Sequence, residues 1–439
     1  ANTIMWKQYI KLTWFQLKQQ PIISTVSILG TALSICLIML FVMIKQVKVA
    51  PIAPESNRDR FLHTMLCAAE KGEENTTSGM SIGTFNAVFG NLTTPEAVTS
   101  YDIFTSVALA NIPGQYGIPA DVKGTDGNFW KVFDFNFIDG KPYTQVEFKS
   151  EIPVAVISET ISRKLFGTSQ SAGREFQMSH KPYRVIGVVK DASILTNFAY
   201  AQIWAPYSVF NQITKIFNQS DKLTGMTSCT ILAKDKGDLQ EIRNEVDRKL
   251  KEYNKSIESS GYKVNLYNQP YDHEKATLIS LETNKIEPDV AYTKRIRYIV
   301  FLILLIVPAI NLSSMTQSRF RQRVSEIGVR RAFGCTRREL VMQLLSENLI
   351  LTLAGGILGL LLSIVAGIIG ESLLFIDTMP TTSITMPEIH MNMLLQPSTF
   401  FLSLLFCFIL NLMSTGIPAW HASKTNIVNA LEGSINNNR

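Results

Sequence analysis

A cluster of basic side chains is the clearest candidate for binding chemistry in this sequence. Seven arginines lie between Arg319 and Arg338, and the only acidic residue among them is Glu326. Guanidinium groups bind carboxylates and phosphates through paired hydrogen bonds. The cluster could therefore contact anionic lipid headgroups or acidic side chains of a partner. An uncharged apolar stretch lies on each side of it, which is typical of a short loop on the cytoplasmic side of a membrane.

The common phosphate-binding and metal-binding motifs do not occur in the chain. It contains no G-x-x-x-x-G-K-[ST] phosphate loop and no H-E-x-x-H or C-x-x-C metal motif. The five histidines are dispersed, and His273, between Asp272 and Glu274, is best interpreted as part of a solvated loop. We therefore expect no catalytic residue, no metal site and no cofactor-binding site in this chain.

The cysteines leave one question open. Cys67 and Cys229 fall in the large polar region of the chain. They could form a disulfide if that region lies outside the cytoplasm, or they could remain two buried free thiols.

Composition indicates a chain divided between bilayer and water. Of 439 residues, 46% are hydrophobic and 18% are charged, and the mean hydropathy is +0.12. The net charge of +6 and pI near 8.9 could suggest nucleic acid. The positive excess lies beside apolar segments, however, and no nucleic-acid-binding motif is found, so we expect no nucleic-acid partner.

Four apolar segments are long enough to cross about 30 Å of hydrocarbon as helices. They are residues 22–44, 298–315, 348–370 and 400–418. The first could instead be a signal peptide, but it is too long for one and lacks an A-x-A cleavage site, so we expect a retained span. In the third, Gly355 and Gly359 form a G-x-x-x-G pair, which permits close helix approach.

The positions of lysine and arginine predict the orientation. Basic residues precede the first span and fill the loop between the second and third, whereas residues 371–396 contain no Lys or Arg. Both termini and the arginine loop are therefore expected to be cytoplasmic, in a multi-pass protein of the cell inner membrane. Residues 1–20 carry Trp6, Ile10 and Trp14 on one helical face, which predicts an amphipathic helix in the membrane interface, in contact with lipids.

The region between the first two spans predicts a large two-lobed α+β domain outside the cytoplasm. Residues 50–119 are rich in loop-forming residues. Strands are expected at 152–158, 183–189, 228–233 and 262–267, with helices at 159–166 and 238–253. Asp238 and Glu241 form a predicted capping pair for the second helix.

The fold class is thus a membrane protein with four transmembrane helices and an α+β domain between the first two. The expected boundaries are 1–20 for the interfacial helix, 21–45 for the first span, 46–281 for the domain, 282–318 for a stalk and the second span, 319–343 for the arginine loop, 344–370 for the third span, 371–397 for an outer loop, 398–418 for the fourth span and 419–439 for the tail.

The arginine loop itself shows signs of defined structure. Thr336 and Glu339 fit a capping box that opens the helix of the third span. Gly334 suits the end of a preceding short helix, 324–333. A soluble partner could push a compact corner of this kind, and the push would reach the two spans attached to it. The alternative interpretation is a topology signal with anionic-lipid contacts.

A longer pattern in the loop resembles a known family. The run Arg323-Val-Ser-Glu326-Ile-Gly328-Val-Arg330-Arg331-Ala-Phe-Gly334 is similar to the signature loop of FtsX-like/MacB-like permeases of ABC transporters, with Cys335 and Leu340 where Ala and Ile are usual. The tail from Pro418 to Leu431 resembles the family's terminal motif, with Asn426-Ile427 in place of a proline. The runs 124–129, 154–159, 164–167 and 185–191 resemble the MacB-type periplasmic core domain.

The resemblance implies a membrane subunit without a fused ATPase. ATP and Mg would be bound by a dimer of separate ABC ATPase subunits. A second copy of the chain or a paralogous permease would complete the membrane part, and a periplasmic adaptor and an outer-membrane channel could join it. The residues expected to couple the chain to the ATPase are Glu326, Gly328, Arg330, Arg331, Gly334, Arg337 and Arg338.

Three functions fit the sequence to different degrees. The favoured one is a permease that transmits ATP-driven motion to its periplasmic domain for export or extraction of a substrate. A regulator that activates an extracytoplasmic hydrolase without transport uses the same residues, but this type usually has a smaller outer domain. A membrane receptor is disfavoured because three spans follow the outer domain and no signalling domain follows them.

Overall fold

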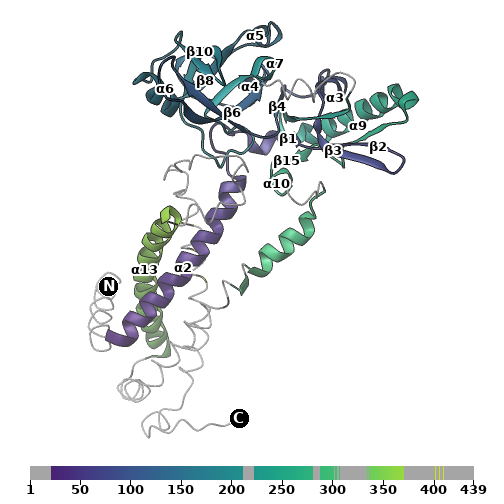
Figure 1. Cartoon of the computed structure of the whole chain (residues 1–439). Helices are drawn as coiled ribbons and strands as arrows, with labels where there is room; N and C mark the ends of the chain where they lie inside the picture. Colours follow the sequence, from purple (N-terminus) through teal and green to yellow (C-terminus); the bar gives the residue numbers. More distant parts are fainter. Residues whose placement is uncertain are drawn as a thin grey trace. The chain divides into compact units, whose positions relative to one another are not determined.

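The computed structural model describes residues 21–210, 222–279, 287–300, 302, 303, 306, 334, 336–369, 401, 405 and 409. The chain divides into two compact units (Figure 1). One, the α+β domain, contains the described residues of Val47–Val290; the other contains α2 up to Gln46 and the described residues after 290. Predictions for residues 1–20, for 371–397 and for the tail 419–439 lie outside the described residues.

Two long helices occupy the first and third predicted spans. They are α2 (Pro21–Val49) and α13 (Arg337–Ile369), so both helix predictions are confirmed. By length and apolarity, Leu349–Gly367 within α13 is long enough to cross a membrane, with a mean hydropathy of 2.5, whereas the apolar part of α2, Ile28–Val42, is shorter. The few described residues of the second and fourth predicted spans are helical. The count of four spans therefore stays a prediction.

The described part of the α+β domain contains fifteen strands. They are β1 (Phe61–Thr64), β2 (Cys67–Lys71), β3 (Glu74–Met80), β4 (Ala97–Asp102), β5 (Ser106–Asn111), β6 (Ile118–Thr125), β7 (Phe137–Gly140), β8 (Val154–Ser158), β9 (Glu175–Met178), β10 (Lys181–Val189), β11 (Ile203–Pro206), β12 (Thr224–Gly225), β13 (Thr227–Leu232), β14 (Lys263–Asn265) and β15 (Tyr271–Asp272).

These strands form one continuous path of pairings. Its order is β11-β8-β10-β9-β5-β6-β4-β13-β3-β2-β14, with β7 on β10, β12 on β3, and β1 joining β13 to β15. Most pairs are antiparallel, but β8 with β10 and β6 with β11 are parallel. A mixed sheet with helices is an α+β arrangement.

Short helices and one long helix accompany the strands. They are α3 (Ile82–Val88), α4 (Phe129–Val132), α5 (Gln145–Lys149), α6 (Glu159–Phe166), α7 (Tyr207–Phe210), α9 (Leu239–Ser256) and α10 (His273–Ala276), with 3₁₀ turns η1 (Arg58–Arg60), η2 (Lys236–Asp238) and η3 (Glu258–Ser260).

The β8–α6 segment shows why its prediction is confirmed. Every residue of β8 is buried, as expected for the apolar run that the sequence shows there. The hydroxyl of Ser158 accepts a hydrogen bond from the backbone N–H of Ile161 and caps α6. The helix ends at Gly167, whose φ of +71° suits glycine.

The long helix α9 confirms its predicted apolar stripe but not its cap. Ile242 and Val246 are buried, and Leu239, Leu250 and Tyr253 pack against the same cluster. The predicted capping pair of Asp238 with Glu241 is wrong. The Asp238 carboxylate instead accepts from the backbone N–H of Asp235, 3.1 Å away, and closes a capping box around η2.

The expectation that residues 50–119 are loop-rich is also wrong. This region contains β1 to β5 and α3. The sequence conceals β3 because its first residues are exposed and polar, and their pairing with β2 takes place in an antiparallel hairpin. A strand exposed on both faces lacks the apolar alternation by which strands are recognised.

Three hydrophobic clusters follow the strand order. One lies around β5, β6, β8 and β10, and another lies between α3, α9 and β13. The third contains aromatic side chains from several elements, among them Phe61, Tyr101, Phe133 and Trp204. The domain thus has separate cores toward the two ends of its strand order and a shared aromatic core.

Candidate coupling site

The described part of the arginine loop is a glycine turn followed by a helix start. Gly334 has a φ of +94°, a backbone conformation that side chains rarely adopt. Thr336 is exposed and α13 begins at the next residue, Arg337. The predicted turn at Gly334 and the predicted helix start after Thr336 are therefore both present.

The other predicted coupling residues are only partly placed. Arg337 and Arg338 form the first turn of α13, and their side chains are not among those described. Glu326, Gly328, Arg330 and Arg331 lie outside the described residues, so their coupling role stays a prediction.

A glycine face on α13 packs directly against α2. A β-carbon on Gly355 would lie 2.8 Å from the β-carbon of Thr31, and one on Gly359 would lie 2.7 Å from the carbonyl oxygen of Ala32. Thr31 and Ala32 are buried. The G-x-x-x-G spacing therefore marks a real helix contact, because only glycine lets the two backbones approach this closely.

The opposite faces of the two helices carry apolar stripes. Leu29, Leu33 and Leu37 of α2 are 52%, 59% and 44% exposed. On α13, Ile357 and Leu361 are exposed at the same four-residue spacing. Exposed apolar stripes of this length mark surfaces that are covered in the native setting, and their chemistry matches lipid tails.

A buried ion pair lies in the α+β domain just after the end of α2. Both Nε and Nη2 of Arg58 lie 2.9 Å from Oε2 of Glu55. The other carboxylate oxygen accepts hydrogen bonds from the backbone N–H groups of Phe198 and Ala199, at 2.9 and 3.0 Å. Both charged side chains are buried, and such a pair persists only when its remaining donors and acceptors are satisfied.

Two histidine rings adjoin this ion pair. Nε2 of His63 lies 3.1 Å from Nδ1 of His273, and Nδ1 of His63 lies 2.9 Å from the hydroxyl of Thr230. The His63 ring stacks on Phe198 with centroids 3.8 Å apart. Burial, with the Arg58 charge nearby, lowers the pKa of His63 to about 3, so its ring is neutral at neutral pH.

The prediction of a solvated loop at His273 is wrong. His273 opens α10 and is 4% exposed. The carboxylate of Asp272 caps that helix by accepting from the backbone N–H of Lys275. The charged residues around His273 suggested a surface position, but the pairing of β15 with β1 buries its ring.

Sequence reasoning missed Glu55, Arg58 and His63 as candidate residues. The only signal was weak: His63 stands in a short apolar strand, and Glu55 and Arg58 follow a prolyl segment directly after the first span. Their partners lie far along the chain, and no local pattern shows this.

A buried carboxylate organises the run 124–129 that carries part of the resemblance. Asp126 accepts hydrogen bonds from Thr99, from the backbone and hydroxyl of Ser100, and from the backbone N–H groups of Asn128 and Phe129. Burial raises the pKa of Asp126 to about 6 in spite of these bonds. Its role in the described structure is to hold β4 against the start of α4.

Of the two possibilities for the cysteines, the structure contains the two buried free thiols. Cys67 and Cys229 are both buried free thiols, so the disulfide is not formed in the structure. Burial raises the pKa of the Cys67 thiol to about 12, and that of Cys229 is raised for the same reason.

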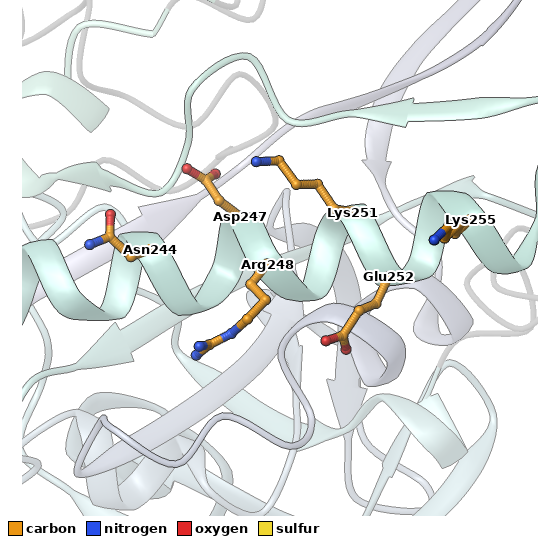
Figure 2. A pocket seen from close by; sticks show the side chains of 6 residues that line it. All are labelled: Asn244, Asp247, Arg248, Lys251, Glu252 and Lys255. Atoms are coloured by element: carbon orange, nitrogen blue, oxygen red, sulfur yellow. The ribbon is translucent and has the colours of Figure 1, made fainter.

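One surface hollow lies along the solvent face of α9 (Figure 2). Its lining side chains are charged or polar and all come from this one helix: Asn244, Asp247, Arg248, Lys251, Glu252 and Lys255. A ligand site is normally concave, mostly apolar and built from several elements, so this hollow has the character of an ordinary solvated helix face. Among the residues the structure describes, no group of three or more His, Cys, Asp or Glu is arranged to hold a metal ion.

Comparison with known proteins identifies the family. A model described as the MacB-like periplasmic core domain matches residues 24–249, and one described as the FtsX-like permease C-terminal matches residues 298–427. The first match alone covers more than half of the chain. The chain belongs to the MacB/FtsX family of ABC transporter permeases.

Matches to relatives in this family cover only part of each protein. An uncharacterized ABC transporter permease, YknZ of Bacillus subtilis (strain 168), is 25% identical over 241 residues, which are 55% of each chain. The macrolide export ATP-binding/permease protein MacB of Bdellovibrio bacteriovorus is 23% identical over 301 residues, 67% of this chain and 41% of that one. The chain thus spans about half the length, or less, of these relatives.

One solved domain resembles part of the chain. The extracellular domain of a YknZ transporter from Gram-positive bacteria is 15% identical, with a TM-score of 0.32, over 46% of this chain and 99% of that one.

Membership in the MacB/FtsX family settles two coarse points. The chain belongs to a family of ABC transporter permeases and has an extracytoplasmic α+β domain, so the resemblance seen in the sequence is confirmed. Permeases of this family are membrane proteins.

Proposed function

We propose that this permease transmits the ATP-driven motion of a separate ATPase dimer to its periplasmic domain, for export or extraction of a substrate. The observation that carries the proposal is the glycine contact between α13 and α2. α13 starts at the arginine turn, and α2 continues without a break past Val47, where the α+β domain begins, to Val49. A push on the turn would therefore reach the domain through two closely packed helices.

The residues proposed to receive the push are those of the arginine loop. Glu326, Arg330 and Arg331 would make polar contacts to the ATPase, because charged and bidentate donors suit a protein surface that carries both signs of charge. Gly328 and Gly334 would permit close docking and the turn. Arg337 and Arg338, at the start of α13, would add positive charge next to the turn.

The same proposal includes the orientation of the chain and its partners. The N-terminus, arginine loop and C-terminus would face the cytoplasm of a cell with an inner membrane. A second copy or a paralogous permease would face the first, with lipids on the apolar stripes. A periplasmic adaptor and an outer-membrane channel are further proposed partners. ATP and Mg would bind to the ATPase and not to this chain.

The alternative is an ABC-type regulator that activates an extracytoplasmic hydrolase without transport. The size of the domain within Val47–Val290 supports the exporter or extractor. Both versions require that nucleotide binding at the ATPase changes the conformation of the outer domain.

Spin-label distances test this requirement. Labels at Tyr116→Cys, where the native side chain is 98% exposed, and at the exposed Lys255→Cys report on two well-separated parts of the domain. In nanodiscs with the ATPase, trapping with ATP and vanadate should shift the distance between the labels. The chain without the two introduced cysteines gives the background. An unchanged distance in an intact, ATP-hydrolysing complex would contradict motion transmission.

A further inference from the structure

Two segments lie near the two ends of the α+β domain in sequence. Residues 50–60, the leading segment, follow α2 directly. Residues 271–279, the trailing segment, precede the helical residues 290–300. The two segments are brought together because β1, which directly follows the leading segment, pairs with β15 at the start of the trailing segment. His63 lies opposite Tyr271 in that pairing.

Glu55 connects the leading segment to two others. It is fully buried and accepts two backbone N–H groups of the stretch 193–200, which we call the crossover segment. Its Oε2 also lies 4.0 Å from Nε2 of His273 in the trailing segment. One carboxylate thus faces three parts of the chain that are far apart in sequence.

Arg58 completes the connection. Its Nη1 donates to the carbonyl oxygen of Ala50 at 2.8 Å, and its Nη2 donates to the carbonyl oxygen of Leu195 at 2.7 Å. The guanidinium therefore joins the first residue after α2 to the crossover segment. Its planar fork fixes direction as well as distance.

The crossover segment is irregular but buried, and side chains from other parts of the domain form hydrogen bonds with several of its peptide groups. Lys123 of β6 donates to the carbonyl oxygens of Asn197 and Phe198, at 3.2 and 2.9 Å. Trp204 of β11 donates to that of Ala199 at 3.0 Å. Because β6 and β11 belong to the part of the sheet beyond β4, the segment connects that part to the leading and trailing segments.

We propose that Glu55, Arg58 and His273 form a buried clasp that makes the leading and trailing segments move together and passes their displacement to the crossover segment. These are positioning residues for the coupling stroke. The clasp would let α2 and the helix at 290–300 act on the domain as one input. The role of the clasp in coupling rests on the proposed function. The mechanical connection among the three segments does not.

Several features favour a clasp over simple core filling. Well-packed apolar side chains would stabilise this site at least as well as a buried ion pair. The charged groups add fixed geometry between segments, and removing one of them leaves buried polar groups of the others with fewer hydrogen-bond partners. Removal of Glu55 should therefore loosen all three segments at once.

Hydrogen exchange on the full-length chain in nanodiscs tests the clasp. Glu55→Gln keeps the shape of the side chain but removes its charge and one acceptor oxygen. We expect exchange in the crossover and trailing segments to become about tenfold faster or more, since hydrogen bonds to charged groups contribute this much to local opening. Faster exchange at Phe198 and Ala199 alone, with an unchanged trailing segment, would overturn the proposal.

Glu245→Gln is the matched control. Glu245 is also buried, and it accepts hydrogen bonds from Thr93 and Thr94 at the α9 side of the domain. Its variant should speed exchange near those threonines and leave the three clasp segments unchanged. Equal acceleration of the clasp segments by both variants would reduce Glu55 to a general stabilising role and would contradict the clasp.

The wild-type chain gives a test that does not depend on how a variant folds. With increasing low concentrations of urea, the leading, crossover and trailing segments should open as one unit, with a common dependence on denaturant. Independent opening of the trailing segment would overturn the clasp. Neither measurement uses the ATPase, so the clasp can fail while the proposed function stands, and the reverse.

Discussion

Gly359 of α13 lies so close to Ala32 of α2 that a β-carbon at Gly359 would be 2.7 Å from the Ala32 carbonyl oxygen. Real β-carbons essentially never approach a backbone atom this closely, and a backbone atom moves only if the whole helix moves. The contact therefore fixes the distance between two helices whose ends lead to the arginine turn and to the α+β domain.

Enlarging Gly359 should separate these helices. We expect Gly359→Leu to lower the unfolding free energy of the membrane unit by about 1–3 kcal/mol or more, because overpacking forces backbone shifts. The measurement is the thermal unfolding midpoint of the purified chain in detergent. Ala354→Leu adds a similar volume at an exposed position of the same helix and should leave the midpoint unchanged. Equal midpoints for Gly359→Leu and wild type would contradict the close contact.

The carboxylate of Asp126 should be essential for the fold of the α+β domain. It accepts five hydrogen bonds in a buried site. Asp126→Ala leaves these donors without an acceptor, which we expect to cost about 3 kcal/mol or more. Chemical denaturation of the full-length chain measures the loss, with Asp247→Ala on the exposed face of α9 as the control (Figure 2). A loss no larger than that of the control would show that Asp126 is dispensable.

The two cysteines of the domain should be unreactive in the folded protein. Both are buried, and burial raises both thiol pKa values, so the reactive thiolate is scarce. Peptide-resolved mass spectrometry after alkylation should find Cys67 and Cys229 unmodified under native conditions and modified after unfolding. A peptide pair that is linked until reduction would instead reveal the bridge.

The buried ring of His63 should make the domain sensitive to acid. Its pKa is about 3 when folded, against an ordinary value of 6.5. Above pH 6.5 the ring is neutral in both states and has no effect on the pH dependence of folding. As pH falls from 6.5 toward 3, only the unfolded state binds a proton, so stability falls by up to about 1.4 kcal/mol per pH unit.

The corresponding variant removes this sensitivity. His63→Gln should show a smaller drop of the unfolding midpoint between pH 7 and pH 5 than the wild-type chain. His180→Asn changes an exposed histidine and should keep the wild-type drop. If His63→Gln kept the full drop, the acid sensitivity would have another source.

The elements predicted correctly from sequence are those whose patterns are local. β8, α6 and the stripe of α9 combine an apolar period with a cap or a glycine stop, so their residues alone define them. The glycine pair on α13 is a further local signal. It predicts close approach to another helix but does not identify α2 as that helix.

The features that sequence reasoning missed depend on distant contacts. β3 is polar along its exposed end and is a strand because of its partner β2. His273 stands among charges but is buried, because a strand about 210 residues away in sequence pairs beside it. Glu55 and Arg58 would be ordinary surface charges if the crossover segment did not cover them. No periodicity or spacing reports such tertiary burial.

The central claim is that the arginine loop docks on an ATPase, and co-purification tests it most directly. The chain is expressed with an ABC ATPase of the lipoprotein-release or macrolide-exporter type and purified through a tag on the chain. Arg330→Glu combined with Arg331→Glu should abolish recovery of the ATPase, because reversing both charges removes the polar contacts proposed for these arginines. The matched control reverses Lys294 and Arg295, two exposed cations of the helix at 290–300, and should recover the ATPase in full. Full recovery with the Arg330/Arg331 variant would contradict the coupling role of this loop.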